Sequence, residues 1–378
     1  MEGAKRRVLH YVDSDIFGGC EEAALHLMAA LDRTRWEPVL LHHPGPGVAR
    51  LVNGAASLGI RTQAVPRVSP RRRLAGLLRL WRAIRAEHPT VFHAHLSWPL
   101  ACKYGVLAAW LARVPAIVAT AQLYLDPGSG RQARWMLRLL RCVIAVSDEV
   151  KTRYSRELGV PPGKLAVVRN GIRVPPAAGV PDSGLRAELV RGRPDYIVLT
   201  PARLHSQKGH AYLLTAAAQV RDATFILAGD GPLRADLEGR ARELGIAERC
   251  VFLGHRSDVP DLLAAADLFV LPSLFEGLPL SVLEAMAAQR PVVATAIGGT
   301  DEAVTHELTG LLVPPRDPAA LASAIRRIRS DPALAHRLAA AGRDRVEREF
   351  SSVVTGHKVM SIYDDITGGA GKMDGPHA

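Results

Sequence analysis

Cysteine, aromatic residues and long apolar runs are all scarce in this chain of 378 residues. Its four cysteines are widely spaced and include no CxxC pair, which argues against a disulfide scaffold and favours a reduced compartment. The best candidate for a membrane span, residues 104–112, is bracketed by Lys103 and Arg113 and is too short to cross a bilayer. The basic N-terminus runs into a strand-like segment rather than a secretory leader, so we expect a cytoplasmic protein.

Positive charge is concentrated in one half of the chain. Of the net charge of +11, residues 1–180 carry +14 and residues 181–378 carry −3. A protein coated evenly by nucleic acid would not divide its charge in this way, and we expect no nucleic-acid partner. The first half is instead expected to face another anionic partner, such as a membrane surface or an acidic substrate.

The densest basic run predicts an amphipathic helix at residues 71–87. Arg72 and Arg79 fall on one face of this helix. The opposite face carries an apolar stripe at helical spacing: Leu74, Leu77, Leu78, Trp81 and Ile84. Such a helix either packs its stripe on a sheet with its arginines in water, or lies on an anionic lipid surface.

Short apolar runs alternate with helical patterns along the whole chain. Strands are expected at residues 8–12, 38–43, 60–66, 91–95, 116–121, 142–146 and 165–170, and again at 196–202, 223–229, 250–254, 268–272, 291–295 and 310–314. In the first half, helices are expected at about 20–31, 71–87, 97–112, 131–140 and 147–158. Apolar strands that alternate with helices predict parallel sheets with right-handed crossovers.

The sequence therefore predicts an α/β protein of two doubly wound, Rossmann-like domains, residues 1–176 and 185–350. A Pro- and Gly-containing hinge at 174–184 separates the two halves. Ligands of such folds bind beyond the carboxyl ends of the strands, so two facing domains would form a site in the cleft between them.

Two cations follow the strand expected at 196–202. Arg203 and Lys208 lie five residues apart around an expected helix start. A guanidinium binds phosphate oxygens as a fork and an ammonium acts as a point charge, so the pair suits a diphosphate. Two solvated charges in a loop are the alternative interpretation.

Two acids follow the strand expected at 268–272. Glu276 lies in a loop that contains glycine and proline, and Glu284 follows eight residues later in the next expected helix. A carboxylate such as that of Glu284 suits a vicinal diol. The spacing Ser281-x-x-Glu284 is also that of a helix capping box, which offers a structural alternative for Glu284.

Glycines occur in two of the expected strand-to-helix loops. Gly18 and Gly19 permit close backbone approach at a helix N-terminus, where an anion is favoured. Gly229 and Gly231 form a tight turn after the strand at 223–229. The first loop lacks GxGxxG and no GxxxxGK[ST] occurs in the chain, which disfavours a dehydrogenase and a P-loop protein.

Metal ligands are not predicted in the first half. Asp13 and Asp15 form a DxD, but a two-acid loop more often caps or solvates a turn. His93 and His95 end the strand at 91–95, and the sequence offers no third ligand near them. A substrate-facing or buried histidine is the preferred interpretation.

In combination, these motifs resemble a known family. The second half is similar to the family 4 retaining glycosyltransferases of GT-B architecture, also called glycosyl transferases group 1. The similarity runs almost continuously from about residue 196 to 330 and includes PARLHSQKG, AGDGPL and SLFEGLPLSVLEAMAAQRPVVAT, where Glu276-x7-Glu284 is the family's signature spacing. The first half resembles the family more loosely, through GGCEEAALHLMAAL, FHAHL, VIAVSDEVK and VVRNGI.

The resemblance implies two domains that face each other across a cleft, with a C-terminal helix at about 351–366 crossing back onto the first domain. It implies a retaining hexosyltransferase that needs no metal or other cofactor. The donor would be a UDP- or GDP-sugar, and the acceptor a hydroxyl of a glycan or lipid-linked molecule. With the basic first half, this predicts cell-envelope polysaccharide or glycolipid synthesis, peripheral to the inner face of the membrane.

The resemblance also implies roles for individual residues. Arg203 and Lys208 would bind the donor diphosphate and stabilise it as it leaves. Glu284 would hold the ribose hydroxyls, and Glu276 would contact the donor sugar near its reacting carbon. The backbone groups expected near the donor are those of Gly277, Leu278, Leu280, Gly18, Gly19, Gly229 and Gly231.

Two departures from the family's pattern affect the acceptor side. Gln122 stands where the family often has a histidine, and it cannot act as a base, so His93 and His95 are further acceptor-side candidates. Arg173 replaces the family's usual acid in the Asn170-Gly171 segment. A non-catalytic nucleotide-sugar-binding protein and a sugar-nucleotide epimerase of related fold remain as alternatives.

Overall fold

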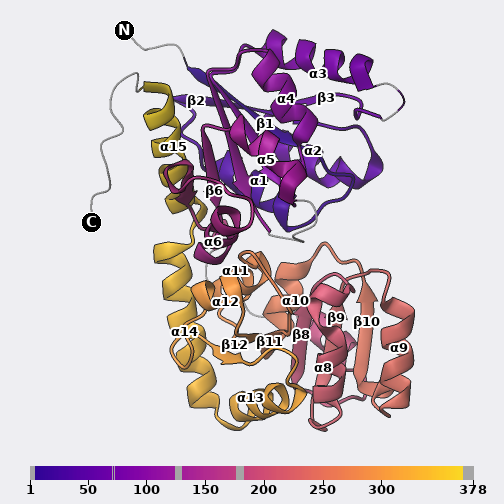
Figure 1. Ribbon diagram of the computed structural model, residues 1–378. Coiled ribbons are helices and arrows are strands. Elements are labelled where there is room, and N and C mark those ends of the chain that lie inside the picture. Colours follow the sequence, from indigo (N-terminus) through magenta and orange to yellow (C-terminus); the bar gives the residue numbers. More distant parts are fainter. Residues whose placement is uncertain (1–4, 70, 72, 124–129, 176–182, 369–378) are drawn as a thin grey trace. The chain divides into compact units, whose positions relative to one another are not determined.

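The computed structural model describes residues 5–69, 71, 73–123, 130–175 and 183–368. The chain divides into two compact units: residues 1–171 with 352–378 form unit 1, and residues 172–351 form unit 2 (Figure 1). Each unit is built on one parallel sheet with connecting helices, which confirms the predicted fold class.

In unit 1, every strand expected from the sequence is present. The strands are β1 (Arg6–Val12), β2 (Trp36–His42), β3 (Arg61–Ala64), β4 (Val91–Leu96), β5 (Ala116–Ala121), β6 (Cys142–Ala145) and β7 (Leu165–Val167). The helices are α1 (Gly19–Ala30), α2 (Ala49–Ser57), α3 (Arg73–Glu87), α4 (Lys103–Leu111), α5 (Gly130–Arg138), α6 (Asp148–Arg156) and α15 (Ser352–Gly368).

Unit 2 also has every strand that the sequence predicts. Its strands are β8 (Ile197–Pro201), β9 (Thr224–Ala228), β10 (Cys250–Gly254), β11 (Leu268–Leu271), β12 (Val292–Thr295) and β13 (Leu311–Val313). Its helices are α7 (Ser183–Val190), α8 (His210–Ala217), α9 (Arg234–Glu243), α10 (Val259–Ala265), α11 (Leu280–Ala287), α12 (Gly298–Ala303), α13 (Pro318–Ser330) and α14 (Pro332–Glu349).

Strand order reverses once in each sheet. Within the described residues, the order is β3-β2-β1-β4-β5-β6-β7 in unit 1 and β10-β9-β8-β11-β12-β13 in unit 2. The reversal falls between β1 and β4 in unit 1, and between β8 and β11 in unit 2. The loops that leave these neighbouring strands diverge, which makes the carboxyl end of each pair the favoured place for a ligand.

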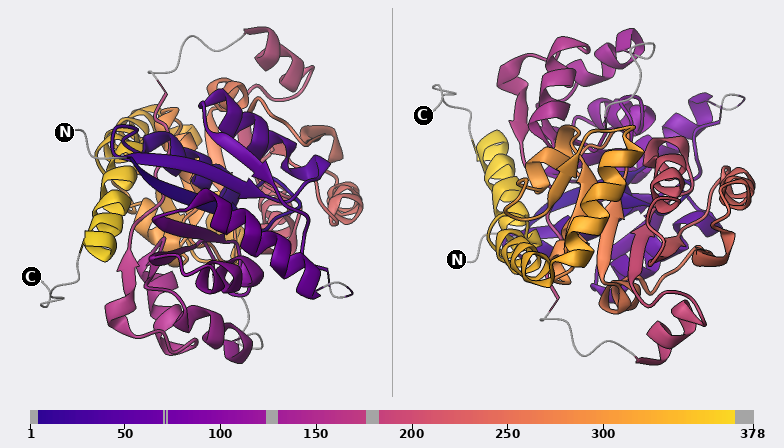
Figure 2. Two further views of the ribbon diagram at one scale, coloured as in Figure 1. Left: turned by 90° about the horizontal axis from the view of Figure 1, so that it is seen from above. Right: turned by 90° about the horizontal axis from the view of Figure 1, so that it is seen from below.

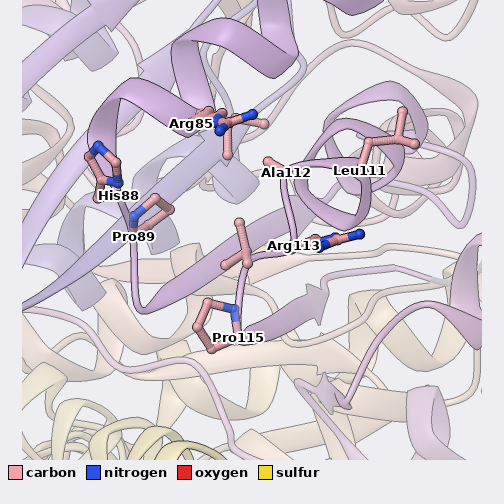
Figure 3. A pocket seen from close by; sticks show the side chains of 9 residues that line it. Arg85, His88, Pro89, Leu111, Ala112, Arg113 and Pro115 are labelled. Carbon is pink, nitrogen blue, oxygen red and sulfur yellow. The ribbon is translucent and has the colours of Figure 1, made fainter.

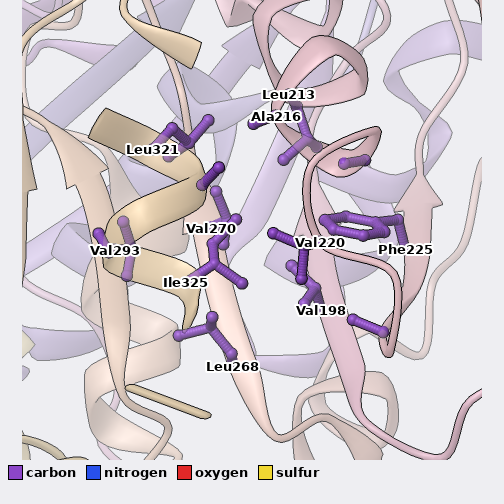
Figure 4. Close-up of a cluster of buried hydrophobic side chains, with 14 of the residues drawn as sticks. Val198, Leu213, Ala216, Val220, Phe225, Leu268, Val270, Val293, Leu321 and Ile325 are labelled. Atoms are coloured by element: carbon purple, nitrogen blue, oxygen red, sulfur yellow. The ribbon is translucent and has the colours of Figure 1, made fainter. Parts of the chain in front are cut away.

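A hydrophobic core of unit 2 joins its sheet to the helices α8, α9, α13 and α14. Phe225, Val270 and Val293 project from the strands toward Leu213 of α8 and Ile325 of α13 (Figure 4). All five side chains are essentially inaccessible to water. Asp317 accepts a hydrogen bond from the Ala320 amide at the start of α13, and Asp331 accepts one from the Leu334 amide at the start of α14. The cap at Asp331 therefore separates α14 from α13.

The C-terminal helix α15 belongs to unit 1, where it packs against α1 (Figures 1 and 2, in yellow). Its Tyr363 is fully buried, meets the Trp36 ring edge-on at 5.2 Å between centroids, and contacts Nδ1 of His93 through its hydroxyl at 2.5 Å. Gly356 allows this approach, because a Cβ there would lie 2.8 Å from the Ala30 carbonyl oxygen. The last helix therefore completes a core whose strands come from the start of the chain.

Two local predictions in unit 1 were wrong or incomplete. The sequence pattern missed α2, whose Asn53-Gly54 step weakens the helical signal; Gly54 serves packing instead, since a Cβ there would meet Leu25 at 2.7 Å. The apolar stripe predicted for α3 is not its buried face, and of that stripe only Ile84 is buried.

The helix α3 packs instead through Gly76, Leu80 and Ala83, because Gly76 lets it approach Val68 closely. Leu74 is 84% and Leu78 43% exposed, and Arg79 is also exposed. Arg72 lies outside the described residues. Among the described helices, none combines the length and apolar character that a membrane span requires.

Replacing Tyr363 tests the contribution of α15 to unit 1. Tyr363→Ala removes a buried ring, and we expect it to lower the free energy of unfolding by about 3–5 kcal/mol. Tyr363→Phe keeps the ring but leaves His93 without one partner, at a cost of about 1–3 kcal/mol. Denaturant unfolding measures the loss of stability in both variants, and Val353→Ala on the exposed face of the same helix is the control. An equal loss of unfolding free energy in Tyr363→Ala and in the control would contradict this packing.

Candidate functional site

The strand reversal in unit 2 brings the loop after β8 against the loop after β11. The Lys208 ammonium lies 2.5 Å from Oε1 of Glu276, and the two side chains are only 15% and 7% exposed. Ser273 donates a hydrogen bond of 2.6 Å to the same carboxylate oxygen. Gln207 links the two loops through its side-chain amide, which donates to the Phe275 carbonyl at 3.0 Å. Of the expected residues, Lys208 and Glu276 thus meet directly.

Arg203 is exposed, and its guanidinium has no ion pair or side-chain hydrogen bond with any residue that the structure describes. Its backbone is held by the next loop, since the Leu204 amide donates to the Asp230 carbonyl at 3.0 Å. The glycines of AGDGPL make this approach possible. A Cβ on Gly229 would lie 2.0 Å from the Ala202 oxygen, and one on Gly231 would lie 2.4 Å from the Leu204 oxygen. These glycines therefore position Arg203.

The loop that carries Glu276 is held by a residue that the sequence did not single out. A Cβ on Gly299, at the start of α12, would lie 1.6 Å from the Gly277 carbonyl oxygen. The side chains of Leu278 and Leu280 are buried, which anchors the loop from its other side. The AIGGT segment carries a double glycine, but only the folded chain shows that Gly299 meets a loop 22 residues away in sequence.

Glu284 is not part of a capping box, so the structural alternative for it is wrong. Helix α11 begins at Leu280 with the extended Pro279 as its N-cap, and no side chain caps it. Ser281 is consequently already helical, and Glu284 lies in the second turn, half-buried. Its position remains compatible with a ligand-binding role.

One further residue next to this site was missed from the sequence. His210, the first residue of α8, is 2% exposed, and neither of its ring nitrogens has a partner among the described residues. Burial, together with the neighbouring positive charge of Lys208, lowers the pKa of His210 to about 4. The Lys208-Gly209-His210 sequence alone does not show that this ring is buried, which is why it carried no signal.

In unit 1, the glycines after β1 lie at the start of α1. The Gly18 amide donates to the Glu21 carboxylate at 2.8 Å, and a Cβ on Gly19 would meet nothing within 4 Å. Gly19 therefore has no packing reason to be glycine.

The two acids of the DxD in the same loop are already paired with a cation. Arg67 forms ion pairs with both Asp13 and Asp15, and the His43 ring lies 3.0 Å from Asp13. Burial opposes ionisation of Asp13, but hydrogen bonds and charge from His43 and Arg67 prevail and lower its pKa. This arrangement agrees with the interpretation of the two acids as loop-stabilising groups rather than metal ligands.

The acceptor-side candidates lie together at the carboxyl ends of β4, β5 and β7. Gln122 and Asn170 form a reciprocal amide pair, with N–O distances of 2.6 and 3.3 Å. They line a cavity of about 10 Å³ with His95 and Thr120, which has room for about one water molecule. His93 is further in, between Tyr363 and Thr120. Burial lowers the pKa of His95 to about 3.

A larger hollow of about 630 Å³ lies elsewhere in unit 1 (Figure 3). It is lined by Arg85, His88 and Arg113 together with apolar residues of the segments 84–89 and 111–115. Because Pro89 and Pro115 precede β4 and β5, it lies at the amino-terminal edge of the sheet, opposite to the acceptor-side candidates. None of the site residues expected from the sequence lines it.

Known protein families match most of this chain. Two family models match, the glycosyl transferase 4-like domain over residues 18–171 and glycosyl transferases group 1 over residues 195–331. Glycogen synthase of Mycobacterium tuberculosis is 32% identical over 323 residues, which cover 79% of this chain and 73% of that enzyme. The UDP-Gal:alpha-D-GlcNAc-diphosphoundecaprenol alpha-1,3-galactosyltransferase of Escherichia coli is 29% identical over 314 residues, which cover 78% and 80%.

Among solved structures, Anabaena HepE in complex with UDP and glucose superposes with a TM-score of 0.84 at 24% identity, over 95% of this chain and 100% of HepE. The two parallel-sheet units and this similarity define a GT-B fold. The chain belongs to the glycosyl transferases group 1 family and is a glycosyltransferase that uses a nucleotide sugar.

The contact between Gly299 and Gly277 gives a sharp test of the site. Gly299→Ala would place a methyl group on the Gly277 carbonyl, and we expect the Glu276 loop to shift and nucleotide affinity to fall by roughly tenfold or more. Isothermal calorimetry with a nucleoside diphosphate measures the effect. Gly239→Ala in α9, where a Cβ meets only the end of the Arg242 side chain at 3.8 Å, is the matched control. Unchanged affinity in Gly299→Ala would show that this contact does not shape the site.

Proposed function

We propose that this chain transfers a hexose from a UDP- or GDP-sugar to a hydroxyl of a glycan or lipid-linked acceptor, with retention of configuration and without a metal ion. The observation that carries the proposal is the Lys208–Glu276 pair at the strand reversal of unit 2, with Arg203 exposed on the same loop after β8 as Lys208. Two cations and an acid at that edge match the three chemical demands of the donor: a diphosphate, a sugar and a developing positive charge.

The cations are proposed to act on the leaving group. As the glycosidic bond breaks, negative charge grows on the diphosphate, and Arg203 and Lys208 stabilise it where other enzymes use Mg²⁺ or Mn²⁺. Lys208 has three N–H donors, so it can bind phosphate oxygens while one donor stays on Glu276. This arrangement supports metal independence.

The acids are proposed to hold the two sugars of the donor. Glu276, fixed by Ser273 and Lys208, accepts hydrogen bonds from the hexose near its reacting carbon. Glu284, in the second turn of α11, accepts from the ribose hydroxyls.

On the acceptor side, the described residues suit a reaction without a protein base. Gln122 and Asn170 are neutral amides that bond each other, and the neutral His95 ring is buried. Retention is therefore proposed to follow front-side attack, in which a donor phosphate oxygen takes the proton of the acceptor hydroxyl. In this scheme, the replacement of the family's histidine by Gln122 does not abolish transfer.

For the acceptor, we propose a lipid-linked glycan of the cell envelope, reached from the cytoplasmic side. The E. coli relative is named for an acceptor linked to diphosphoundecaprenol. On α3 of unit 1, Leu74 and Leu78 are exposed beside Arg79, as on helices that lie on anionic lipid. Arg85 and Arg113 add positive charge around the hollow near the end of that helix.

Nucleotide binding and transfer together test the donor assignment. We expect UDP or GDP, added with chelator at a hundred times its Kd, to stabilise the protein by about 2.7 kcal/mol in a thermal melt, and ADP and NAD to have little effect. Glu276→Gln keeps the size of the side chain and removes its charge, so transfer should fall by roughly 10²-fold or more while the nucleotide still binds. Glu243→Gln, exposed on α9, is the control.

The outcomes separate the alternatives. Nucleotide binding without transfer to any hydroxyl acceptor would favour a non-catalytic sugar-nucleotide-binding protein, and conversion of the donor hexose itself would favour an epimerase. Binding of NAD alone would favour a dehydrogenase. Full transfer by Glu276→Gln would remove Glu276 from the mechanism.

Vesicle binding tests the membrane assignment. We expect sedimentation with phosphatidylglycerol vesicles at low salt, with loss of binding as salt rises. Arg72→Ser with Arg79→Ser should weaken binding by roughly tenfold or more, since each arginine near an anionic surface contributes about 1 kcal/mol. Arg191→Ser with Arg221→Ser, two exposed arginines of unit 2, is the matched control of equal charge. No binding at low salt would favour a water-soluble acceptor.

A further inference from the structure

Three histidines that are far apart in sequence meet in the core of unit 1. The parallel register of β1 and β4 pairs His10 directly with His93, and His95 follows two residues later on the same face. The ring centroids are 4.6 Å apart for His93 and His95, and 5.3 Å from each of these to His10. All three residues are at most 2% exposed.

The hydrogen bonds of this cluster are incomplete. His10 Nδ1 and His95 Nε2 lie 3.0 Å apart and share one proton position. Nε2 of His10 and Nδ1 of His95 are buried and have no partner among the described residues. Each of these two rings therefore uses one nitrogen within the pair and has its second nitrogen without a partner among the described residues.

We propose that His10, His93 and His95 bind one transition-metal ion of the Zn²⁺ or Co²⁺ type. One ring nitrogen from each histidine lies within 4.8 Å of the other two. Tetrahedral Zn–N bonds of about 2.0–2.1 Å require nitrogens about 3.3 Å apart. The His10–His95 distance is already close to this value, and the third ring needs to move by at most about 1.5 Å.

The surroundings of the cluster favour ligation. Burial, reinforced by repulsion between the rings, lowers the pKa of His10 and His93 well below the ordinary value, so the imidazoles are unprotonated at neutral pH, as metal ligands must be. Thr120 and Tyr363 contact the two nitrogens of His93 at 2.7 and 2.5 Å. When one nitrogen of His93 binds the ion, the contact on the other keeps the ring oriented.

The donor set also indicates which ion and which fourth ligand are suitable. Three imidazoles without carboxylate suit zinc, cobalt, nickel or copper and disfavour Mg²⁺ and Ca²⁺. The cavity of about 10 Å³ beside His95 has room for about one water molecule as the fourth ligand. The site lies in unit 1, beside the acceptor-side residues Gln122 and Asn170, and it takes no part in the donor chemistry proposed for unit 2.

Metal titration of the untagged chain of residues 1–378 tests the proposal. After removal of metal with chelator, we expect about one equivalent of Co²⁺ to bind with the intense visible bands of a tetrahedral complex, to be displaced by Zn²⁺, and to raise the Tm. His10→Gln and His95→Gln should lose this equivalent. His42→Gln should retain it, because His42 is a buried histidine of β2 in the same unit outside the cluster.

X-ray absorption of the wild-type zinc complex makes the test independent of whether the variants fold. Scattering from three imidazoles is the expected result. Failure of the wild-type chain to take up a stoichiometric ion would overturn the proposal and leave the cluster as a hydrogen-bonded stack. Equal loss of metal by His42→Gln and the cluster variants would overturn it as well.

Discussion

Parallel pairing of strands that are distant in sequence, β1 with β4 and β8 with β11, determines where the polar groups of this protein meet. In a parallel sheet all strands point the same way, so the loops that follow them emerge at one edge. Where the strand order reverses, neighbouring loops run to opposite faces and leave their ends free of crossovers. Lys208 and Glu276 meet at one such place, and His10 meets His93 and His95 at the other.

By itself, the buried Lys208–Glu276 ion pair contributes little to folding stability. Both side chains have lost most of their contact with water, and the attraction between two buried charges often does no more than offset their desolvation. Ser273 and Gln207 support the loop around the pair, and Gly299 supports it from behind. Such a rigid arrangement is what positioning of a diphosphate and a reacting sugar requires.

In unit 1, the acceptor-side candidates are uncharged, whereas helix α3 on the surface is basic. At the carboxyl edge of its sheet, Gln122 pairs with Asn170 and the histidine rings are held neutral by burial. On α3, Leu74 and Leu78 are exposed together with Arg79, because the helix buries a face that includes Gly76 and Leu80 instead. The charge asymmetry between the halves of the sequence thus belongs to the surface of unit 1.

Periodicity predicted much of this protein. The two parallel sheets follow from buried runs rich in Val, Ile and Leu that alternate with helices, since strands covered on both faces must be apolar throughout. The loops that contain Arg203, Lys208 and Glu276 were predicted correctly as strand ends, because local pattern suffices to locate the end of a strand. The same segments carry the resemblance to the family.

Only the tertiary structure shows which residues that are distant in sequence contact each other. Arg67 pairs with both Asp13 and Asp15 from a loop about fifty residues away, and Gly299 is glycine because another loop lies against it. The sequence did not single out His10 as a neighbour of His93 and His95, because strand pairing, and not spacing along the chain, brings it there. Sequence by itself determined which segments become strands and helices, since that depends on each residue's neighbours along the chain. Folding decided which side chains touch, since packing joins residues that no local pattern relates.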